Sequence, residues 1–285
     1  MSDVGLVLEG GGMRGLYTAG VLDYFMEEEL YLPYVIGVSA GACHGSSYLS
    51  KQQGRSKRAN INYVNDSRYL SYKNLFKGES LFGMDFMFDT IPKRLEPFDF
   101  ETFFNYEGRY IVGTTDCQTG KVRYFDRSDC DSNDDILDIV RASSSLPFIS
   151  PIVEFKGCEL LDGGLAAPIP IRKSVADGND KHIVILTRSP GYRKDRFKFK
   201  WLAKLFYSDY PKIVEVLIER HQIYNQTLDY IKSLESAGDI FLIQPSKPLD
   251  VKRIERDKDK LERLYQQGYQ DCKETFGSLK EWLSR

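Results

Sequence analysis

The segment VGLVLEGGGMRG, residues 4–15, decides the fold, because it joins an apolar run directly to a cluster of glycines. Val4–Leu8 is typical of a short buried strand, and Leu16–Glu29 has apolar residues at helical spacing. The pattern then repeats, since Tyr34–Val38 predicts a second strand and Ser39–Ser50 a second helix. Alternating strands and helices predict an α/β fold with a parallel sheet. Right-handed crossovers bring both strand-to-helix turns to the carboxyl edge of such a sheet, where ligands bind.

The rest of the chain continues this pattern around one irregular segment. Residues 66–108 are rich in aromatic side chains without a clear period, and we interpret them as a lid or cap-like insertion. Further strands are predicted at 109–115, 122–126, 153–155, 160–161, 182–187 and 239–243, and helices at 131–143, 211–236 and 250–284. We therefore expect a three-layer α/β sandwich, with a mostly parallel central sheet and helices on both faces.

Composition excludes several classes of protein. Of the 285 residues, 42% are hydrophobic and 28% charged, which is typical of a globular chain rather than a disordered or collagen-like one. Lys and Arg total 39 against 41 Asp and Glu, and this balance argues against bulk binding of nucleic acid. No apolar stretch approaches the roughly 20 residues of a membrane span, and no secretory signal is visible. We expect a cytoplasmic protein, or one that contacts a membrane peripherally.

The cysteines and histidines indicate no metal centre. The number of cysteines, five, is odd, and none of them forms a CxxC pair. This pattern favours free thiols in a reducing compartment. The chain has three histidines, with no HExxH motif and no Cys/His cluster at zinc spacing, and it lacks EF-hand spacing. We expect neither a metal nor a cofactor.

The glycine cluster Gly10–Gly15 is the first motif with chemical meaning. It satisfies the G-x-G-x-x-G pattern and opens a helix after a strand, so its backbone N–H groups can converge on an anion. That anion is either the pyrophosphate of a nucleotide or the oxyanion of a tetrahedral intermediate. A dinucleotide-binding fold would carry Asp or Glu at the end of its second strand. Because none stands there, a nucleotide-binding oxidoreductase is the weaker alternative.

The end of the second predicted strand instead carries Gly37-Val38-Ser39-Ala40-Gly41. This is G-x-S-x-G at a strand-to-helix turn, the pattern of a nucleophile elbow. Gly37 and Gly41 allow the strand and the helix to pass closely, and the bend lifts the Ser39 hydroxyl out of the packing. We therefore predict that Ser39 is a nucleophile.

A base for this serine is harder to find among the histidines than among the carboxylates. His44 lies along the elbow helix, His182 begins a buried strand, and His221 lies within a long helix, so structural roles are favoured for all three. Asp162 is the better candidate, because it follows two leucines and precedes Gly163 and Gly164, which free the backbone.

Together, the three motifs resemble the patatin-like phospholipases, with Gly10–Gly15 as the glycine-rich loop, Gly37–Gly41 as the elbow and Asp162–Gly164 as the downstream DGG motif. The small-residue stretch 141–147 resembles the family's segment before that motif. The resemblance covers residues 4 to about 190. It divides the chain into a catalytic core, 1–190, and an extension, 191–285, that packs on the core.

The resemblance also implies roles for individual residues. Ser39 and Asp162 would form a catalytic dyad without histidine, acting through an acyl-enzyme on lipid esters. The amides of Gly10, Gly11 and Gly12 would hold the oxyanion. Arg14 would brace this loop or face a lipid phosphate. The remaining motif glycines would permit close backbone approach: Gly15, Gly37, Gly41, Gly163 and Gly164.

Residues Arg193–Phe206 interleave basic and aromatic side chains. This composition is typical of an interfacial anchor on anionic lipid, and also of the exposed edge of a helix that covers a sheet. We predict peripheral membrane contact through this segment. We expect no binding of nucleic acid, because the rest of the chain offers no supporting basic surface. A family member that binds lipid without turnover remains a second alternative.

Overall fold

A mixed sheet of eight strands forms the centre of the computed structural model, which describes residues 4–71 and 81–285. The strand order is β5-β6-β3-β2-β1-β7-β8, and β4 pairs with β3 alone. The strands are β1 (Val4–Leu8), β2 (Tyr34–Val38), β3 (Arg109–Asp116), β4 (Val122–Asp126), β5 (Val153–Phe155), β6 (Cys158–Asp162), β7 (Lys181–Ile185) and β8 (Ile240–Ile243).

Five neighbouring strands are parallel, and the other three join the sheet through antiparallel pairings. β3, β2, β1, β7 and β8 run in one direction. β4, β5 and β6 form antiparallel pairs beyond them. Every residue of β1 and β2 is buried, which explains why both strands are continuous apolar runs rather than alternating ones.

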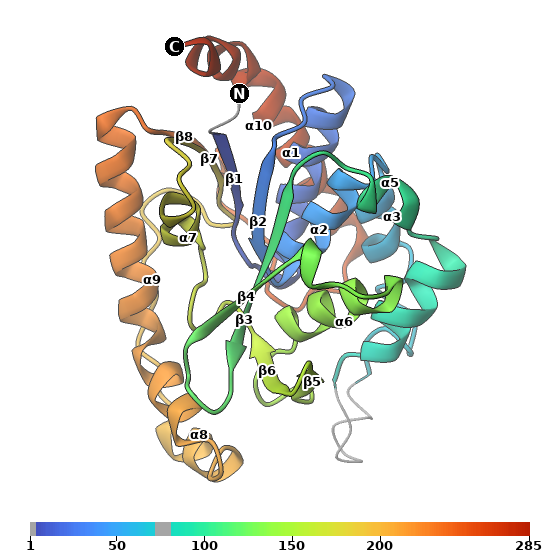
Figure 1. The fold of residues 1–285 in the computed structure, drawn as a ribbon, viewed down its shortest axis with the longest axis vertical. Helices are drawn as coiled ribbons and strands as arrows, with labels where there is room; N and C mark the ends of the chain where they lie inside the picture. The colour runs from blue at the N-terminus through green and yellow to red at the C-terminus, as the bar shows by residue number, and fades with distance from the viewer. Residues whose placement is uncertain (1–3, 72–80) are drawn as a thin grey trace.

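Helices cover both faces of the sheet, as Figure 1 shows. Leu6, Leu8 and Val35 belong to the larger apolar core on one face, whereas Val7 and Ile36 point into a second core on the other. The helices of the first face are α1 (Leu16–Glu27), α2 (Ala40–Leu49), α3 (Arg55–Ile61), α6 (Asn133–Ser143) and α10 (Lys258–Ser284). Those of the second face are α7 (Ile171–Ala176) and α9 (Pro211–Ala237). The predicted three-layer fold with a mostly parallel sheet is therefore confirmed.

The C-terminal helix α10 packs along α1. α1 is buried from Leu16 through Met26, because the sheet covers one side of it and α10 the other. The backbones approach so closely that a Cβ on Gly268 would lie 2.0 Å from the Tyr17 carbonyl oxygen. Tyr265 donates a hydrogen bond to the buried carboxylate of Asp23, at 2.7 Å.

The predicted insertion contains short helices against the first face. Its described part includes η2 (Phe86–Leu95), a π-helical segment with Pro92 inside it, and α5 (Phe100–Phe104). Residues 72–80 of the predicted lid lie outside the described residues. The irregular winding of η2 explains why its aromatic residues showed no helical period in the sequence.

Three short elements complete the fold: η1 (Gly12–Gly15), η3 (Arg127–Asp129) and α8 (Lys200–Phe206). α8 lies at the end of the molecule opposite the C-terminal end of α10 (Figure 1). Across the described ranges, no helix combines the length and the apolar character needed to cross a bilayer.

Candidate active site

The glycine loop and the serine elbow lie side by side at one edge of the sheet. Leu8 pairs with Gly37 in the parallel register of β1 and β2, so the two strands end together. A Cβ on Gly10 would lie 3.2 Å from the Cβ of Ser39. The two motifs predicted to meet at the carboxyl edge are therefore in contact.

Ser39 adopts the strained backbone of a nucleophile elbow. Its φ of 53° and ψ of −126° are rare for a residue with a side chain, and α2 begins immediately after it. The turn is tight, because a Cβ on Gly37 would lie 2.7 Å from the Ala42 nitrogen and one on Gly41 2.5 Å from the Leu8 carbonyl oxygen. Strain of this kind, held by close packing, is a feature of functional sites.

Ser143 holds this elbow in place. The Ser39 N–H donates to the Ser143 Oγ at 2.8 Å, and the Ser143 hydroxyl donates to the Gly113 carbonyl at 2.7 Å. Ser143 is fully buried and lies in the small-residue stretch 141–147. Sequence reasoning noted this stretch but assigned it no role. The structure gives Ser143 one, that of positioning the serine backbone.

Asp162 reaches the same edge through the short antiparallel strand β6. Val38 pairs with Gly113 on β3, and the next residue of β3, Thr114, pairs with Asp162. Asp162 is thus level with Ser39 across β3. Its Oδ1 accepts a hydrogen bond from the Gly164 N–H at 2.7 Å, whereas its Oδ2 is buried without a partner among the described residues.

The glycine loop offers two free backbone donors. The Gly10 N–H already donates to the Pro168 carbonyl at 3.3 Å, and the Met13 N–H to that of Arg253 at 3.0 Å. Within the described residues, no hydrogen bond involves the N–H of Gly11 or Gly12. Gly12 has a φ of 57°, which favours glycine there. The loop amides without a hydrogen bond in the described part of the chain are therefore those of Gly11 and Gly12, whereas the amide of Gly10, also predicted to hold an oxyanion, already has a partner.

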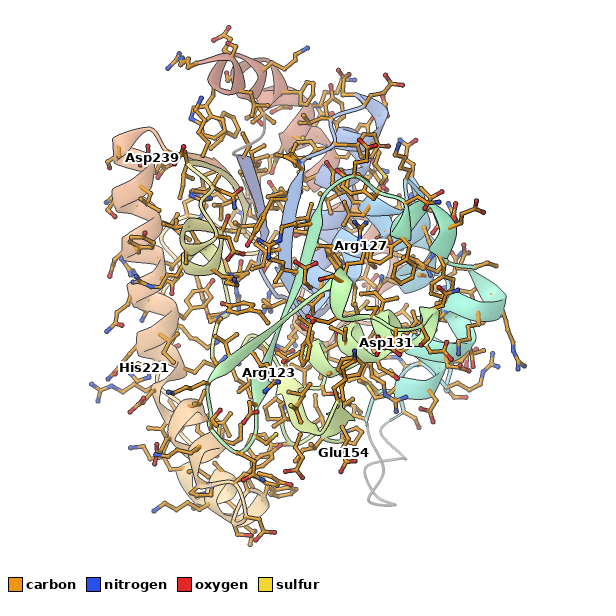
Figure 2. All side chains as sticks on the ribbon, in the orientation of Figure 1. Arg123, Arg127, Asp131, Glu154, His221 and Asp239 are labelled. Carbon is orange, nitrogen blue, oxygen red and sulfur yellow. The ribbon has the colours of Figure 1, made fainter. Side chains whose placement is uncertain are left out.

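None of the three histidines lines the pocket that Ser39 and Asp162 share. Burial lowers the pKa of His44 to about 4, so this imidazole is neutral. His182 is buried against the Ser174 hydroxyl, 3.0 Å from its Nδ1. His221 lies on α9 (Figure 2). Its Nδ1 is 3.0 Å from the Ile218 carbonyl oxygen.

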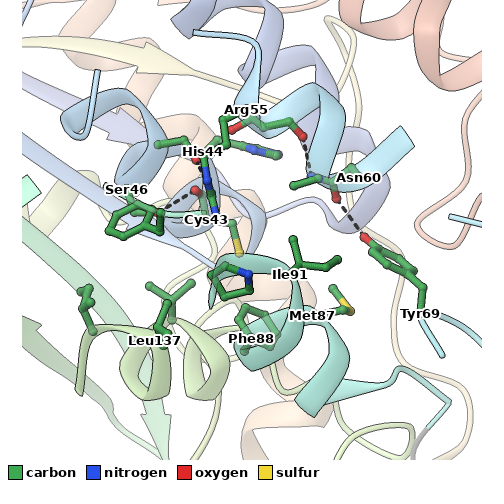
Figure 3. A pocket seen from close by; sticks show the side chains of 17 residues that line it. Cys43, His44, Ser46, Arg55, Asn60, Tyr69, Met87, Phe88, Ile91 and Leu137 are labelled. Atoms are coloured by element: carbon green, nitrogen blue, oxygen red, sulfur yellow. Dashed lines mark hydrogen bonds between the residues drawn. The ribbon is translucent and has the colours of Figure 1, made fainter. Parts of the chain in front are cut away.

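An apolar pocket opens on one side of Ser39. Met13, Phe82 and Met84 line it near the serine. It shares further lining residues with the neighbouring cavity of Figure 3, where Cys43 and His44 of α2 face the side chains of η2. We call these two cavities together the apolar pocket. Tyr69 and Asn60 line both cavities, and the Tyr69 hydroxyl donates a hydrogen bond to the Asn60 side chain at 2.9 Å.

A cationic cleft opens on the other side of Ser39. Its inner part contains Ser39 and Asp162, and its outer part lies toward α8. The inner part is lined by five basic side chains, namely Arg14, Arg188, Lys194, Arg220 and Arg253. Sequence reasoning singled out Arg14 for this site, assigned Lys194 to the segment Arg193–Phe206 as part of a membrane contact, and missed Arg188, Arg220 and Arg253, which lie in no local motif.

Comparison with known proteins decides the family. A family model described as patatin-like phospholipase matches residues 6–174, which is more than half of the chain. The chain belongs to the patatin-like phospholipase family. A second model, described as a domain of unknown function (DUF6363), matches residues 210–284.

Relatives of this patatin-like chain include both short and long proteins. The uncharacterized protein YjjU of Escherichia coli is 28% identical over 86% of this chain and 69% of its own length. Lysophospholipase NTE1 of Candida albicans is 25% identical over 99% of this chain, which spans 20% of that protein. Among solved structures, VipD of Legionella pneumophila aligns with 98% of this chain and 67% of its own, at 11% identity and a TM-score of 0.48.

Residues 4–71 and 81–285 of this family member contain no group of three or more His, Cys, Asp or Glu side chains that could hold a metal ion. The oxygen and nitrogen atoms gathered around Ser39 instead belong to two carboxylates, those of Asp162 and Glu9, to backbone amides, to tyrosine hydroxyls and to cationic side chains. This arrangement suits nucleophilic attack on a polarised carbonyl group.

Proposed function

We propose that the protein is a lipid acyl hydrolase in which Ser39 is the nucleophile and Asp162 the general base. The observation that carries this proposal is the pairing, in one pocket, of a strained elbow serine with a buried carboxylate oxygen that has no partner among the described residues. A buried acceptor without a partner costs free energy of folding, so its presence calls for a functional explanation. Accepting the proton of the Ser39 hydroxyl provides this explanation.

The proposed reaction runs through an acyl-enzyme. The Ser39 Oγ attacks the ester carbonyl, and its proton passes to the Asp162 Oδ2. The N–H groups of Gly11 and Gly12 stabilise the oxyanion, and the alcohol leaves with the proton from Asp162. Water then attacks the acyl group while Asp162 accepts one of its protons; the bond from the acyl carbon to the Ser39 Oγ breaks, Asp162 returns the proton to this oxygen, and the carboxylic acid is released. The Gly164 N–H holds the carboxylate in position throughout.

Two features support a lipid rather than a small ester as substrate. The apolar pocket begins at Ser39 and is lined by Met, Phe and Tyr side chains, which would accept an acyl chain. The Candida albicans relative, a lysophospholipase by name, aligns with nearly the whole chain. Family membership adds the same expectation.

We also propose that α8 and the residue before it contact the lipid surface. Phe199, Trp201, Leu205 and Phe206 are between 57% and 67% exposed, which is unusual for large apolar side chains in one short segment. Lys198, Lys200 and Lys204 alternate with them. Phe197 and Phe199 also line the outer part of the cationic cleft. A lipid surface bound at α8 would therefore lie beside the cleft that leads to Ser39.

A nucleotide-binding oxidoreductase is not favoured by any contact in the site. Ser39 stands where a ribose-binding carboxylate would be expected, at the end of β2. A lipid-binding family member without turnover is the remaining alternative, and kinetics separate it from a hydrolase.

The test is hydrolysis of a micellar lysophospholipid by the wild type, Ser39→Ala and Asp162→Asn. We expect Ser39→Ala to fall to background and Asp162→Asn to lose about 10²–10⁴-fold in kcat, the usual contribution of a general base. Ser236→Ala and Asp259→Asn, both exposed, are the matched controls and should match the wild type. Wild-type protein that binds the lipid without releasing fatty acid would establish the binding alternative instead.

A further inference from the structure

Five basic side chains converge on the inner cleft from separate parts of the chain. Arg14 comes from η1, and Arg188 and Lys194 come from the segment after β7. Arg220 comes from α9, and Arg253 from the segment before α10. No single helix or loop gathers them, so their convergence is a product of the whole fold.

None of the five forms an ion pair with a carboxylate of the described residues. Arg14 is 6% exposed, and its Nε has no hydrogen-bond partner in the described part of the chain. Arg220 donates from Nε to the Gly164 carbonyl at 2.6 Å, and Arg188 stacks on the Tyr192 ring. These contacts are with neutral groups and leave the positive charges unmatched.

The two carboxylates in the inner cleft already have other partners or another role. Glu9 is 2% exposed and accepts hydrogen bonds from Thr187 and Tyr224, and its pKa is raised by burial. Asp162 is the proposed base. Five cations therefore face two carboxylates that cannot balance them.

Burial and the neighbouring positive charges both disfavour the protonated forms of these side chains. The pKa of Lys194 is lowered to about 7 by burial and by the charges of Arg220, Arg253, Arg188 and Arg14. Burial and neighbouring cations lower the pKa of Arg14 and of Arg220 to about 10. An anion bound among them would relieve this repulsion.

The shape of the cleft indicates where an anion would lie. The inner part has a volume of only about 20 Å³, room for about one water molecule. The outer part has about 420 Å³ and shares Lys194, Arg220 and Arg253 with the inner part. The outer part also contains Arg196 and Lys198 against one acid, Asp195. A polar headgroup fits the outer part while the ester reaches Ser39.

We propose that the cationic cleft is a subsite for a terminal phosphate, so that the enzyme prefers lipid esters ending in a phosphate monoester over those ending in phosphocholine. A dianionic phosphate matches the excess of positive charge, and planar guanidinium groups suit phosphate oxygens. A quaternary ammonium beyond the phosphate would instead meet Arg196 and Lys198. This proposal rests on the proposed hydrolase function for its substrate, but its anion-binding part can be tested without turnover.

The binding test uses Ser39→Ala protein titrated calorimetrically with glycerol 3-phosphate, inorganic phosphate and glycerophosphocholine. We expect saturable binding of the first two, and binding of glycerol 3-phosphate at least about tenfold weaker in the added double variant Arg188→Gln/Lys194→Gln. Lys232→Gln, exposed on α9, is the matched control. Thermal unfolding checks that the double variant folds. Absence of saturable binding, or equal binding by the folded double variant, overturns the proposal.

The kinetic test compares 1-acyl-glycerol 3-phosphate with 1-acyl-glycerophosphocholine of the same chain length on wild-type protein. The proposal expects a higher kcat/KM for the phosphate monoester and loss of this preference in Arg188→Gln/Lys194→Gln. Binding of free phosphate without a substrate preference would mark a site for the free ion and overturn the headgroup assignment. Failure of the hydrolase proposal is distinguishable, since it would leave the phosphate titration unchanged while removing the dependence of hydrolysis on Ser39.

Discussion

The apolar pocket and the cationic cleft meet at Ser39 but are built from different parts of the chain. Residues lining the apolar pocket fall between Gly12 and Leu146, within the segment matched by the family model. Four of the five cations of the inner cleft lie beyond that segment, from Arg188 to Arg253. The proposed acyl side of the site therefore lies within the segment matched by the family model, whereas most of the charge that we propose selects the polar end lies beyond it.

The C-terminal segment is in direct contact with the glycine loop and with α1. The Arg253 carbonyl accepts a hydrogen bond from the Met13 N–H, and α10 covers α1. Arg220 and Arg253 also lie within the match to a domain of unknown function. We propose that residues 191–285 are an extension that completes the core 1–190, and not an independent domain.

The largest expected effect comes from Gly12→Ala, because Gly12 lines both the apolar pocket and the cationic cleft. The φ of 57° would cost about 1–2 kcal/mol with alanine, and its Cβ would lie 2.7 Å from the Arg253 carbonyl oxygen. We expect kcat to fall about 10²–10³-fold, as for loss of an oxyanion donor, and phosphate binding to weaken. Gly178→Ala is the control, because Gly178 also has positive φ but nothing within 4 Å. Equal activity of the two variants would refute a role for the Gly12 turn.

Met87→Trp should separate the two sides by altering the apolar pocket alone. Met87 lines both cavities of that pocket, so the larger ring should exclude long acyl chains. We expect kcat/KM for a long-chain ester to fall about tenfold relative to a short-chain ester, with glycerol 3-phosphate binding unchanged. Leu95→Trp, at an exposed position of the same helix, is the control. A uniform loss across chain lengths would contradict the acyl assignment.

The pH dependence of anion binding should sharpen the description of the cationic cleft. Sulfate is the probe because its charge is constant across this range. The pKa of Lys194, lowered to about 7, means that the free protein loses this charge as pH rises through neutrality, whereas a bound anion would favour the protonated form. Sulfate binding should therefore weaken severalfold between about pH 6 and about pH 9, with proton uptake on binding.

Lys194→Arg isolates this effect, because arginine stays charged throughout the range. The charged or titratable groups around Lys194 in the cleft are Glu9, Arg14, Asp162, Arg188, Tyr192, Asp195, Arg196, Lys198, Arg220, His221, Tyr224 and Arg253. A pH profile identical in wild type and Lys194→Arg would assign the titration to another of these groups.

The smallest effect on the chemistry is expected from Trp201→Ser/Leu205→Ser. Both side chains are about two-thirds exposed on α8, and neither lines the apolar pocket or the cationic cleft. We expect co-sedimentation with phosphatidylserine vesicles to fall severalfold while hydrolysis of a monomeric short-chain ester is unchanged. Unchanged vesicle binding would contradict the proposed membrane contact.

The sequence predicted the placement of Ser39, Asp162 and the glycine loop better than that of the cationic side chains, for a physical reason. Ser39 and the glycine loop belong to short motifs whose backbone requirements leave a local trace, and β1 and β2 fix their proximity. Asp162 is likewise followed directly by Gly163 and Gly164. Arg220 and Arg253 leave no such trace, since a lone arginine on a helix or in a loop is typical of a solvated surface. Whether these two side chains line the cleft depends on how α9 and α10 pack on the core.

The basic segment Arg193–Phe206 illustrates the same limit. Its composition could not show that Lys194 turns into the cleft, where its backbone bonds with Asn225, while Trp201 and Phe206 stay exposed. The fold class was predictable because the strand and helix periods are local, and the π-helical winding of η2 was not, because it follows no regular period.

The central claim is that the Ser39 hydroxyl, activated by Asp162, attacks the substrate between these two pockets. The most direct measurement is peptide mapping by mass spectrometry after reaction with an alkyl fluorophosphonate, which phosphonylates activated serines. The account predicts one adduct per chain on the peptide containing Ser39, formed far more slowly in Asp162→Asn and absent in Ser39→Ala. An adduct on another residue, or none from a preparation that hydrolyses lipid, would contradict it.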